Sequence, residues 1–123
     1  MIGLIMPDVN TPFAIEVMKG VNNAIKALDY DLMIYTGGDF RKRKAASQEQ
    51  HYVSLLNNGV TDGVIVVAPV ATKFTTANPI IAIDPNSSMP EYTSITSTNR
   101  EGALETMKHL IDKGHKRICF FTL

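Results

Sequence analysis

The sequence predicts a three-layer αβα domain in which helices cover both faces of a doubly wound, mainly parallel sheet. Two observations lead to this fold class. Short apolar segments alternate with longer segments of helical periodicity along the 123 residues. In addition, the segment GVIVVA at 63–68 is apolar on both faces, which requires cover above and below the sheet. Buried strands joined through helices form parallel sheets, because such crossovers return to the same edge of the sheet.

The first half of the chain predicts three strands and two helices. Residues 2–6 form a short apolar run ended by Pro7, which is typical of a buried strand. Thr11 followed by Pro12 predicts a helix start, because a hydroxyl caps a helix and proline suits its first turn. The resulting elements are a strand at 2–6, a helix over 12–28, a strand at 32–35, a helix over about 41–58 that Gly59 ends, and a strand at 63–68.

The middle of the chain predicts shorter connections. About ten residues, 69–78, separate the strand at 63–68 from the strand expected at 80–84. This length is at the lower limit for a helical crossover, so we expect an irregular or one-turn connection. A Pro- and Ser-rich bend follows, and the TSIT segment 93–96 predicts a further short strand.

The last quarter predicts one helix and one strand. Thr98 and Glu101 have the spacing of a capping box, which predicts a helix that continues to Lys113 and stops at Gly114. The apolar run from Ile118 predicts a core strand. The residues expected to face the core from this helix are Ala103, Met107, Leu110 and Ile111.

Composition bounds the class of protein. Hydrophobic residues make up 45% of the chain and charged residues 20%, and 12 basic residues balance 12 acidic ones, so no global basic field attracts nucleic acid. The single Cys119 excludes an internal disulfide and fits a reducing compartment. We find no membrane span and no basic leader region in residues 1–6. We therefore expect a cytoplasmic protein, or one whose leader has been removed. The RKRK run at 41–44 fits a solvated helix face or a nucleic-acid patch.

Ligands of doubly wound sheets bind outside the carboxyl ends of the strands, so these ends are the places to look for chemistry. The first strand is followed by PDVNTPF, which contains neither a dinucleotide-binding nor a phosphate-binding glycine motif. The candidate ligand-binding residues in this loop are Asp8, Asn10, Thr11 and Phe13. The same residues also suit a turn, a helix cap and core filling, and the residues alone leave both interpretations open.

The fourth strand ends at Asp84, whose carboxylate can accept the paired hydroxyls of a polyol or can start an Asp-Pro turn. The third strand ends at Ala68, where a phospho-acceptor domain would need an aspartate. No arrangement of nucleophile and base and no close pair of carboxylates converges on these ends. His109 and His115 have no second ligand at useful spacing, so no metal site is predicted. The pattern indicates a binding rim without catalysis, and no cofactor.

Three stretches resemble the effector-binding core of the LacI/GalR family of bacterial transcription regulators. They are residues 2–32, 59–68 and 97–121, and the last, STNREGALETMKHLIDKGHKRICFF, is the most specific. The resemblance covers the whole chain. It implies a Rossmann-like, periplasmic-binding-protein-like (type I) fold of two lobes with a small effector, usually a sugar or sugar-like molecule, between them.

The resemblance also implies a homodimer whose operator affinity changes with ligand. We expect residues 1–123 to be a single domain, the N-terminal subdomain of that core, with the helix-turn-helix headpiece and the second lobe absent and operator DNA bound only through that headpiece. An alternative is the same lobe from a periplasmic sugar-binding protein of an ABC transporter, which would carry a signal peptide. A small flavodoxin-like enzyme is a third class, and it would show a bound cofactor or turnover.

By resemblance, Phe13 packs on the ligand and Asp84 takes its hydroxyls. Thr11 stands where Asn is common, Ala14 where a second aromatic often stands, and Pro85 where ribose-type proteins have arginine. These departures make a simple pentose doubtful and leave room for a larger or less polar ligand. The resemblance also places the first helix near a dimer interface, with solvent exposure as the alternative for each candidate contact: Glu16, Lys19, Asn23 and Lys26.

Overall fold

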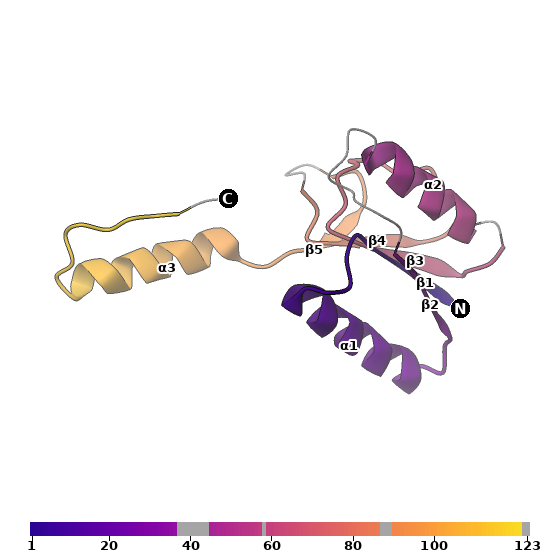
Figure 1. Cartoon of the computed structure of the whole chain (residues 1–123), viewed down its shortest axis with the longest axis horizontal. Helices are drawn as coiled ribbons and strands as arrows, with labels where there is room; N and C mark the ends of the chain where they lie inside the picture. The colour runs from indigo at the N-terminus through magenta and orange to yellow at the C-terminus, as the bar shows by residue number, and fades with distance from the viewer. Residues whose placement is uncertain (37–44, 58, 87–89, 122–123) are drawn as a thin grey trace.

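A computed structural model of the chain, which describes residues 1–36, 45–57, 59–86 and 90–121, contains one sheet of parallel strands (Figure 1). The strand order is β2-β1-β3-β4-β5. The strands are β1 (Ile2–Met6), β2 (Leu32–Thr36), β3 (Gly63–Val67), β4 (Ile80–Ile83) and β5 (Thr93–Ile95), and the helices are α1 (Pro12–Ala27), α2 (Ala45–Asn57) and α3 (Asn99–Asp112). The predicted α/β fold with a doubly wound parallel sheet is confirmed. Residues 41–44, the RKRK run, lie outside the described residues.

Helices α1 and α2 lie on opposite faces of the sheet (Figure 1). Leu4 and Met6 of β1 pack on the α1 side, whereas Ile5 between them packs on the α2 side, as the alternation of side chains along a strand requires. Strand β3 divides in the same way, with Val67 on the α1 side and Val66 on the α2 side. The two central strands are therefore buried on both faces, and each fully buried aliphatic side chain contributes roughly 1.5–3 kcal/mol.

Helix α1 begins as the sequence predicts. Thr11 has extended backbone, its Oγ1 accepts a hydrogen bond from Ala14 N at 3.1 Å, and Pro12 occupies the first turn. The glycines expected to end helices also do so, since Gly59 and Gly114 have φ values of 77° and 89°. These positive angles favour glycine because it has no Cβ.

The connection between β3 and β4 is irregular, as its length predicts, and side chains of α2 hold it. The Glu49 carboxylate accepts hydrogen bonds from Val70 N and Ala71 N, all at 2.9 Å. Further along α2, Gln50 Nε2 donates to the carbonyl oxygen of Lys73 at 3.4 Å. At the end of the helix, Asn57 Nδ2 donates to Thr76 Oγ1. Helix α2 therefore fixes the course of the connection as well as covering the sheet.

The prediction that the last helix faces the core was wrong. Helix α3 forms near the predicted bounds but has no buried residue, and Met107 and Ile111 are 41% and 58% exposed. The helix stands apart from the sheet, and residues 96–98 connect it to β5 (Figure 1). Thr98 makes no side-chain cap hydrogen bond, so the capping box is not formed. The periodicity correctly indicates an apolar helix face, but it carries no information about what covers that face.

The predicted core strand from Ile118 was also wrong. Residues 115–121 are neither helix nor strand, and Phe120 and Phe121 are 85% and 89% exposed. Cys119 is exposed as well, and not the core thiol that its apolar neighbours suggest. A strand needs an adjacent strand to pair its backbone groups. Helix α3 carries this segment away from β5, and the segment pairs with neither described edge strand of the sheet, β2 or β5.

A pair of glycine substitutions tests the close packing of β1 against α2. A Cβ on Gly3 would lie 2.9 Å from Leu56 Cδ1 and 3.3 Å from Thr61 Cγ2, and both of these side chains are buried and have little room to move. A Cβ on Gly20 of α1 would meet nothing within 4 Å. Gly3→Ala should destabilise the chain by about 1–3 kcal/mol through overpacking. Gly20→Ala should instead stabilise it by about 0.5–1 kcal/mol, because alanine favours the helix interior. Urea unfolding measures both, and a neutral or stabilising Gly3→Ala would contradict the packing.

The buried carboxylate of Glu49 generates a pH prediction. Burial raises its pKa above the ordinary value of 4.5, although the N–H groups of Ala71 and Val70 act in the opposite direction. The folded chain then binds the proton more tightly than the unfolded chain does. The contribution of Glu49 to the free energy of unfolding is therefore fully present below about pH 4.5 and is lost as the pH rises through the raised pKa.

Glu49→Gln removes this titration. Urea unfolding of both proteins between about pH 4 and pH 7 should show the stability of the native chain falling relative to the Glu49→Gln variant as the pH rises. If the difference in free energy of unfolding between the two proteins stays constant, or if the native chain gains stability relative to the variant as the pH rises, burial does not dominate the environment of this carboxyl group.

Candidate functional site

The sheet has one topological switch point. After β1 the chain forms α1 and adds β2 on one side, whereas β3 is added on the other side of β1 by way of α2 on the opposite face. The loops that leave β1 and β3 therefore diverge, and a crevice is expected between their carboxyl ends. The loop between β1 and α1 and the residues that follow β3 and β4 form this carboxyl edge, which is the candidate site.

Two side chains in the loop between β1 and α1 form local hydrogen bonds, one in a turn and one at a helix cap. Asp8 Oδ1 accepts a hydrogen bond from Asn10 N at 2.9 Å, which forms a turn, and Thr11 caps α1. These bonds agree with the structural interpretation of Asp8 and Thr11. Asn10 is exposed, and Phe13 is 49% exposed at the start of α1, so Phe13 does not fill the core. An aromatic ring at a site rim offers an apolar face to a ligand.

Asp84 directly follows β4 and has a positive φ of 51°. Its N–H donates to the carbonyl oxygen of Ile95 at 2.8 Å, which continues the pairing of β4 with β5, and its side chain is exposed. Ala68, which follows β3, also has a positive φ, at 50°. Aspartate tolerates this region better than most residues do, whereas alanine adopts it at a cost.

The carboxyl edge brings part of the predicted set together. Strands β1 and β4 flank β3, so Asp84 and the loop that carries Asn10 and Phe13 lie two strand spacings apart, roughly 10 Å at the level of the strands. Between them, β3 ends in Ala68 and Pro69, which add no charged group. The edge thus combines the exposed carboxylates of Asp8 and Asp84, the exposed amide of Asn10 and the half-exposed ring of Phe13 around an uncharged centre.

The residues proposed for dimer contacts lie on the exposed surface of α1. Glu16, Lys19, Asn23 and Lys26 are all exposed, and Lys19 Nζ forms an ion pair with Glu16 Oε1 at 3.4 Å. Beside them is an open, mainly apolar groove of about 270 Å³ between α1 and the edge strand β2. The residues that line it are Ile15, Met18, Lys19, Asn22, Leu32 and Ile34. This groove lies away from the carboxyl edge.

Glu49 and Tyr92 were missed as site-related residues. Glu49 is 3% exposed, and the Tyr92 hydroxyl donates to Ala71 O at 2.7 Å from the other side of the same connection. Burial raises the pKa of Tyr92, and the charge of Glu49 raises it further. The spacing of residues along α2 could have identified Glu49 as buried. It precedes Val53 by four residues and Leu56 by seven, which places it on the buried face of the helix.

The described residues contain neither a metal-binding cluster nor a membrane-spanning helix. Among them, no group of three or more His, Cys, Asp or Glu side chains is placed to hold a metal ion. None of the described helices is long and apolar enough to cross a membrane.

Comparison with curated proteins finds bacterial repressors. The chain is 30% identical to the HTH-type transcriptional repressor PurR of Aliivibrio fischeri, over 98% of this chain and 36% of that protein. It is 29% identical to the sucrose operon repressor of Lactococcus lactis, over 99% of this chain and 37% of the repressor. The chain therefore spans about a third of the length of the curated relatives it matches.

Comparison with solved structures supports the same fold. A periplasmic binding ribose operon repressor protein from Lactobacillus acidophilus superimposes with a TM-score of 0.72 at 25% identity, covering 88% of this chain and 40% of that one. A LacI family regulator from Lactobacillus casei with bound glucose shares the fold at a TM-score of 0.69 and 22% identity, over 94% of this chain and 43% of that one. The family model described as "Periplasmic binding proteins and sugar binding domain of LacI family" matches residues 1–123, and the chain belongs to this family.

Proposed function

We propose that this chain is the N-terminal lobe of the effector-binding core of a LacI/GalR-type transcription regulator, without catalytic activity of its own. The observation that carries the proposal is the carboxyl edge, where exposed Asp84 and half-exposed Phe13 flank an uncharged strand end in a chain of this family. The curated relatives described above are repressors, which favours a cytoplasmic regulator over a transport receptor. In this proposal, operator DNA is contacted through a helix-turn-helix headpiece of the intact protein.

The proposed effector is a sugar or sugar-like molecule. Charge-assisted hydrogen bonds from hydroxyl groups to an exposed carboxylate suit Asp84, and the ring of Phe13 suits the apolar face of a pyranose or furanose. Asn10 adds an amide that can donate and accept. Relatives named for the sucrose operon, the maltose regulon and the ribose operon define the first ligands to test.

The effector would act by differential binding. A ligand changes operator affinity only to the extent that it binds one conformation of the regulator better than the other. A site at the edge of one lobe meets this condition when a second lobe closes over it, because contacts from that lobe then exist only in the closed state. The proposal therefore assigns Asp84 and Phe13 to ligand capture and leaves the change of operator affinity to the movement of the lobes.

The proposed assembly is a homodimer in which α1 and the groove beside β2 face the partner. The groove is apolar and its rim carries Lys19, so a second copy could bury the apolar lining and place charges at the rim. A two-fold arrangement uses the same surface of both chains and closes after two copies.

Asp84→Asn tests the ligand assignment. Asparagine tolerates the positive φ of 51° at a lower cost than alanine does, so the substitution removes the charge with little backbone strain. In the full-length protein, calorimetry with sucrose, maltose, D-ribose and D-glucose should identify a binding sugar, and Asp84→Asn should weaken it by about 1–3 kcal/mol. Asp31→Asn, which changes an exposed carboxylate at the opposite edge of the sheet, is the matched control. If Asp84→Asn and the native protein bind the sugar equally well, Asp84 has only a turn-forming role. If the native protein binds none of these sugars, that result counts against the proposed function.

Charge reversal tests the dimer assignment. Lys19→Glu combined with Lys26→Glu should shift sedimentation velocity profiles of the full-length protein toward the monomer, because like charges would meet across the proposed interface. Lys73→Glu reverses an exposed cation on the connection between β3 and β4 and should leave the dimer intact. Identical profiles for the double variant and the control would place the interface elsewhere.

A further inference from the structure

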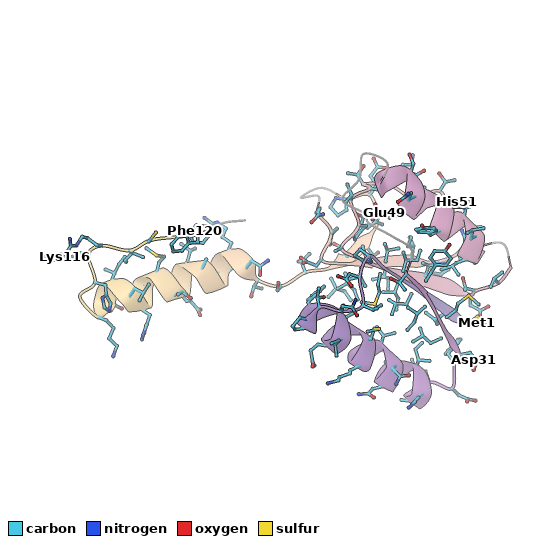
Figure 2. The ribbon with its side chains drawn as sticks, viewed as in Figure 1. Met1, Asp31, Glu49, His51, Lys116 and Phe120 are labelled. Atoms are coloured by element: carbon cyan, nitrogen blue, oxygen red, sulfur yellow. The ribbon has the colours of Figure 1, made fainter. Side chains whose placement is uncertain are left out.

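A buried carboxylate on one helix holds the start of the connection that follows β3. Glu49, near the start of α2 (Figure 2), is 3% exposed, and its Oε1 accepts hydrogen bonds from both Val70 N and Ala71 N at 2.9 Å. Its Oε2 also accepts from Val70 N at 2.9 Å. On the other side, the carbonyl oxygen of Ala71 accepts from the Tyr92 hydroxyl at 2.7 Å. Backbone groups on both sides of this short segment are thus paired with fixed partners.

The same segment is bonded to the turn that follows Asp84. Asn86 N donates to the carbonyl oxygen of Pro69 at 3.0 Å, and this carbonyl belongs to the peptide group whose N–H, on Val70, donates to Glu49. Movement of that peptide group would therefore move the acceptor of Asn86. A second bond, from Glu91 N to the carbonyl oxygen of Thr72 at 2.9 Å, ties the approach to β5 to the same connection.

We propose that Glu49 is a positioning residue for the carboxyl edge: its carboxylate fixes the peptide of Pro69 and Val70, and through that peptide it fixes the turn that carries Asp84. The inference that this turn meets a ligand rests on the proposed function. The positioning itself rests on the hydrogen bonds alone, which connect α2 to the turn in three steps, from Glu49 to Val70, across one peptide group to Pro69, and from Pro69 to Asn86.

The carboxylate is the group that suits this position. Two backbone N–H groups converge on Oε1, and one of them also reaches Oε2, so both oxygens act as acceptors. Glutamine would retain one acceptor and turn an N–H₂ donor toward the Val70 N–H. Alanine would leave both N–H groups without this partner, and the loss is costly above all at Ala71, whose bond is buried.

Amide hydrogen exchange of this 123-residue chain, measured by NMR, tests the positioning role without any ligand. In Glu49→Ala, the amides of Asn86 and Glu91 should exchange at least about tenfold faster than in the native chain. This factor is taken relative to the change in exchange rate of the Val66 amide, which lies in the middle of the sheet and reports the loss of overall stability. Glu49→Gln should show the same pattern at roughly threefold, and it decides the test if Glu49→Ala does not fold.

Thr61→Val is the matched control. Thr61 is 5% exposed and its hydroxyl donates to the carbonyl oxygen of Leu56 at 2.6 Å, so the variant also removes a buried hydrogen bond at α2, but at the amino end of β3. It should change exchange at Asn86 and Glu91 no more than at Val66. If the Glu49 variants behave like Thr61→Val, Glu49 supports the fold in general and the positioning role is wrong.

A binding measurement separates this inference from the proposed function. In the full-length protein, Glu49→Gln should weaken binding of D-ribose, or of whichever tested sugar the native protein binds, by about threefold to tenfold, whereas Thr61→Val should not. If no sugar binds the native protein, the proposed function fails while the exchange experiment still decides the positioning role. If a sugar binds and Glu49→Gln has no effect on its affinity, positioning by Glu49 does not extend to the ligand.

Discussion

Strands β1 and β3 are apolar on both faces, and most of the molecule follows from covering them. Leu4 and Met6 need a partner on one side of the sheet and Ile5 needs one on the other. Helix α1 supplies the first, in the crossover from β1 to β2, and α2 supplies the second, in the crossover from β2 to β3. The chain then leaves β1 toward β2 and leaves β3 toward β4, in opposite directions. The crevice at the carboxyl edge is a consequence of this divergence. The position of the candidate site is therefore fixed by the burial of the strands before any ligand-binding residue is considered.

Two of the described non-glycine residues with positive φ lie at the carboxyl edge, and the third, Asp29, lies between α1 and β2. Ala68 and Asp84 both have positive φ values, of 50° and 51°, at the ends of neighbouring strands. Backbone in this region persists where surrounding contacts hold it, and such positions are concentrated at functional sites. The hydrogen bonds from Ala68 N to Ile83 O at 2.7 Å and from Asp84 N to Ile95 O at 2.8 Å are contacts of this kind. These bonds hold the ends of β3 and β4 in their positive-φ conformation.

Local signals in the sequence predicted most elements, because these signals act within a few residues. Thr11 and Pro12 predicted the start of α1, and Gly59 and Gly114 predicted helix ends where φ is positive. The placement of α3 and of the segment from Ile118 could not be predicted in this way, since each depends on a partner surface far along the chain. A periodic apolar face indicates that another surface must cover the helix, but it does not identify that surface.

Part of the candidate site could be predicted for the same reason. The rule that ligands bind at carboxyl ends of strands located Asn10, Phe13 and Asp84 at one edge, but it could not separate ligand contacts from turn and cap residues. Asp8 and Thr11 have turn and cap roles that their residue types already suggested. Glu49 was overlooked because a charged residue on a helix usually faces water, although its spacing from Val53 and Leu56 placed it on the buried face.

The buried side chain of Glu49 covers the sheet and also pairs backbone N–H groups of the connection that follows β3. A chain that leaves a strand beneath a helix has N–H groups without a strand partner, and here the bond to Ala71 N is buried and the bond to Val70 N is part-buried. An apolar side chain at position 49 would cover these groups and leave them unpaired, whereas a carboxylate covers and pairs them at a cost in desolvation that appears as a raised pKa. The same bonds carry the position of α2 to the peptide that holds the turn after Asp84. A residue retained for backbone pairing thereby also sets the geometry of the candidate ligand site.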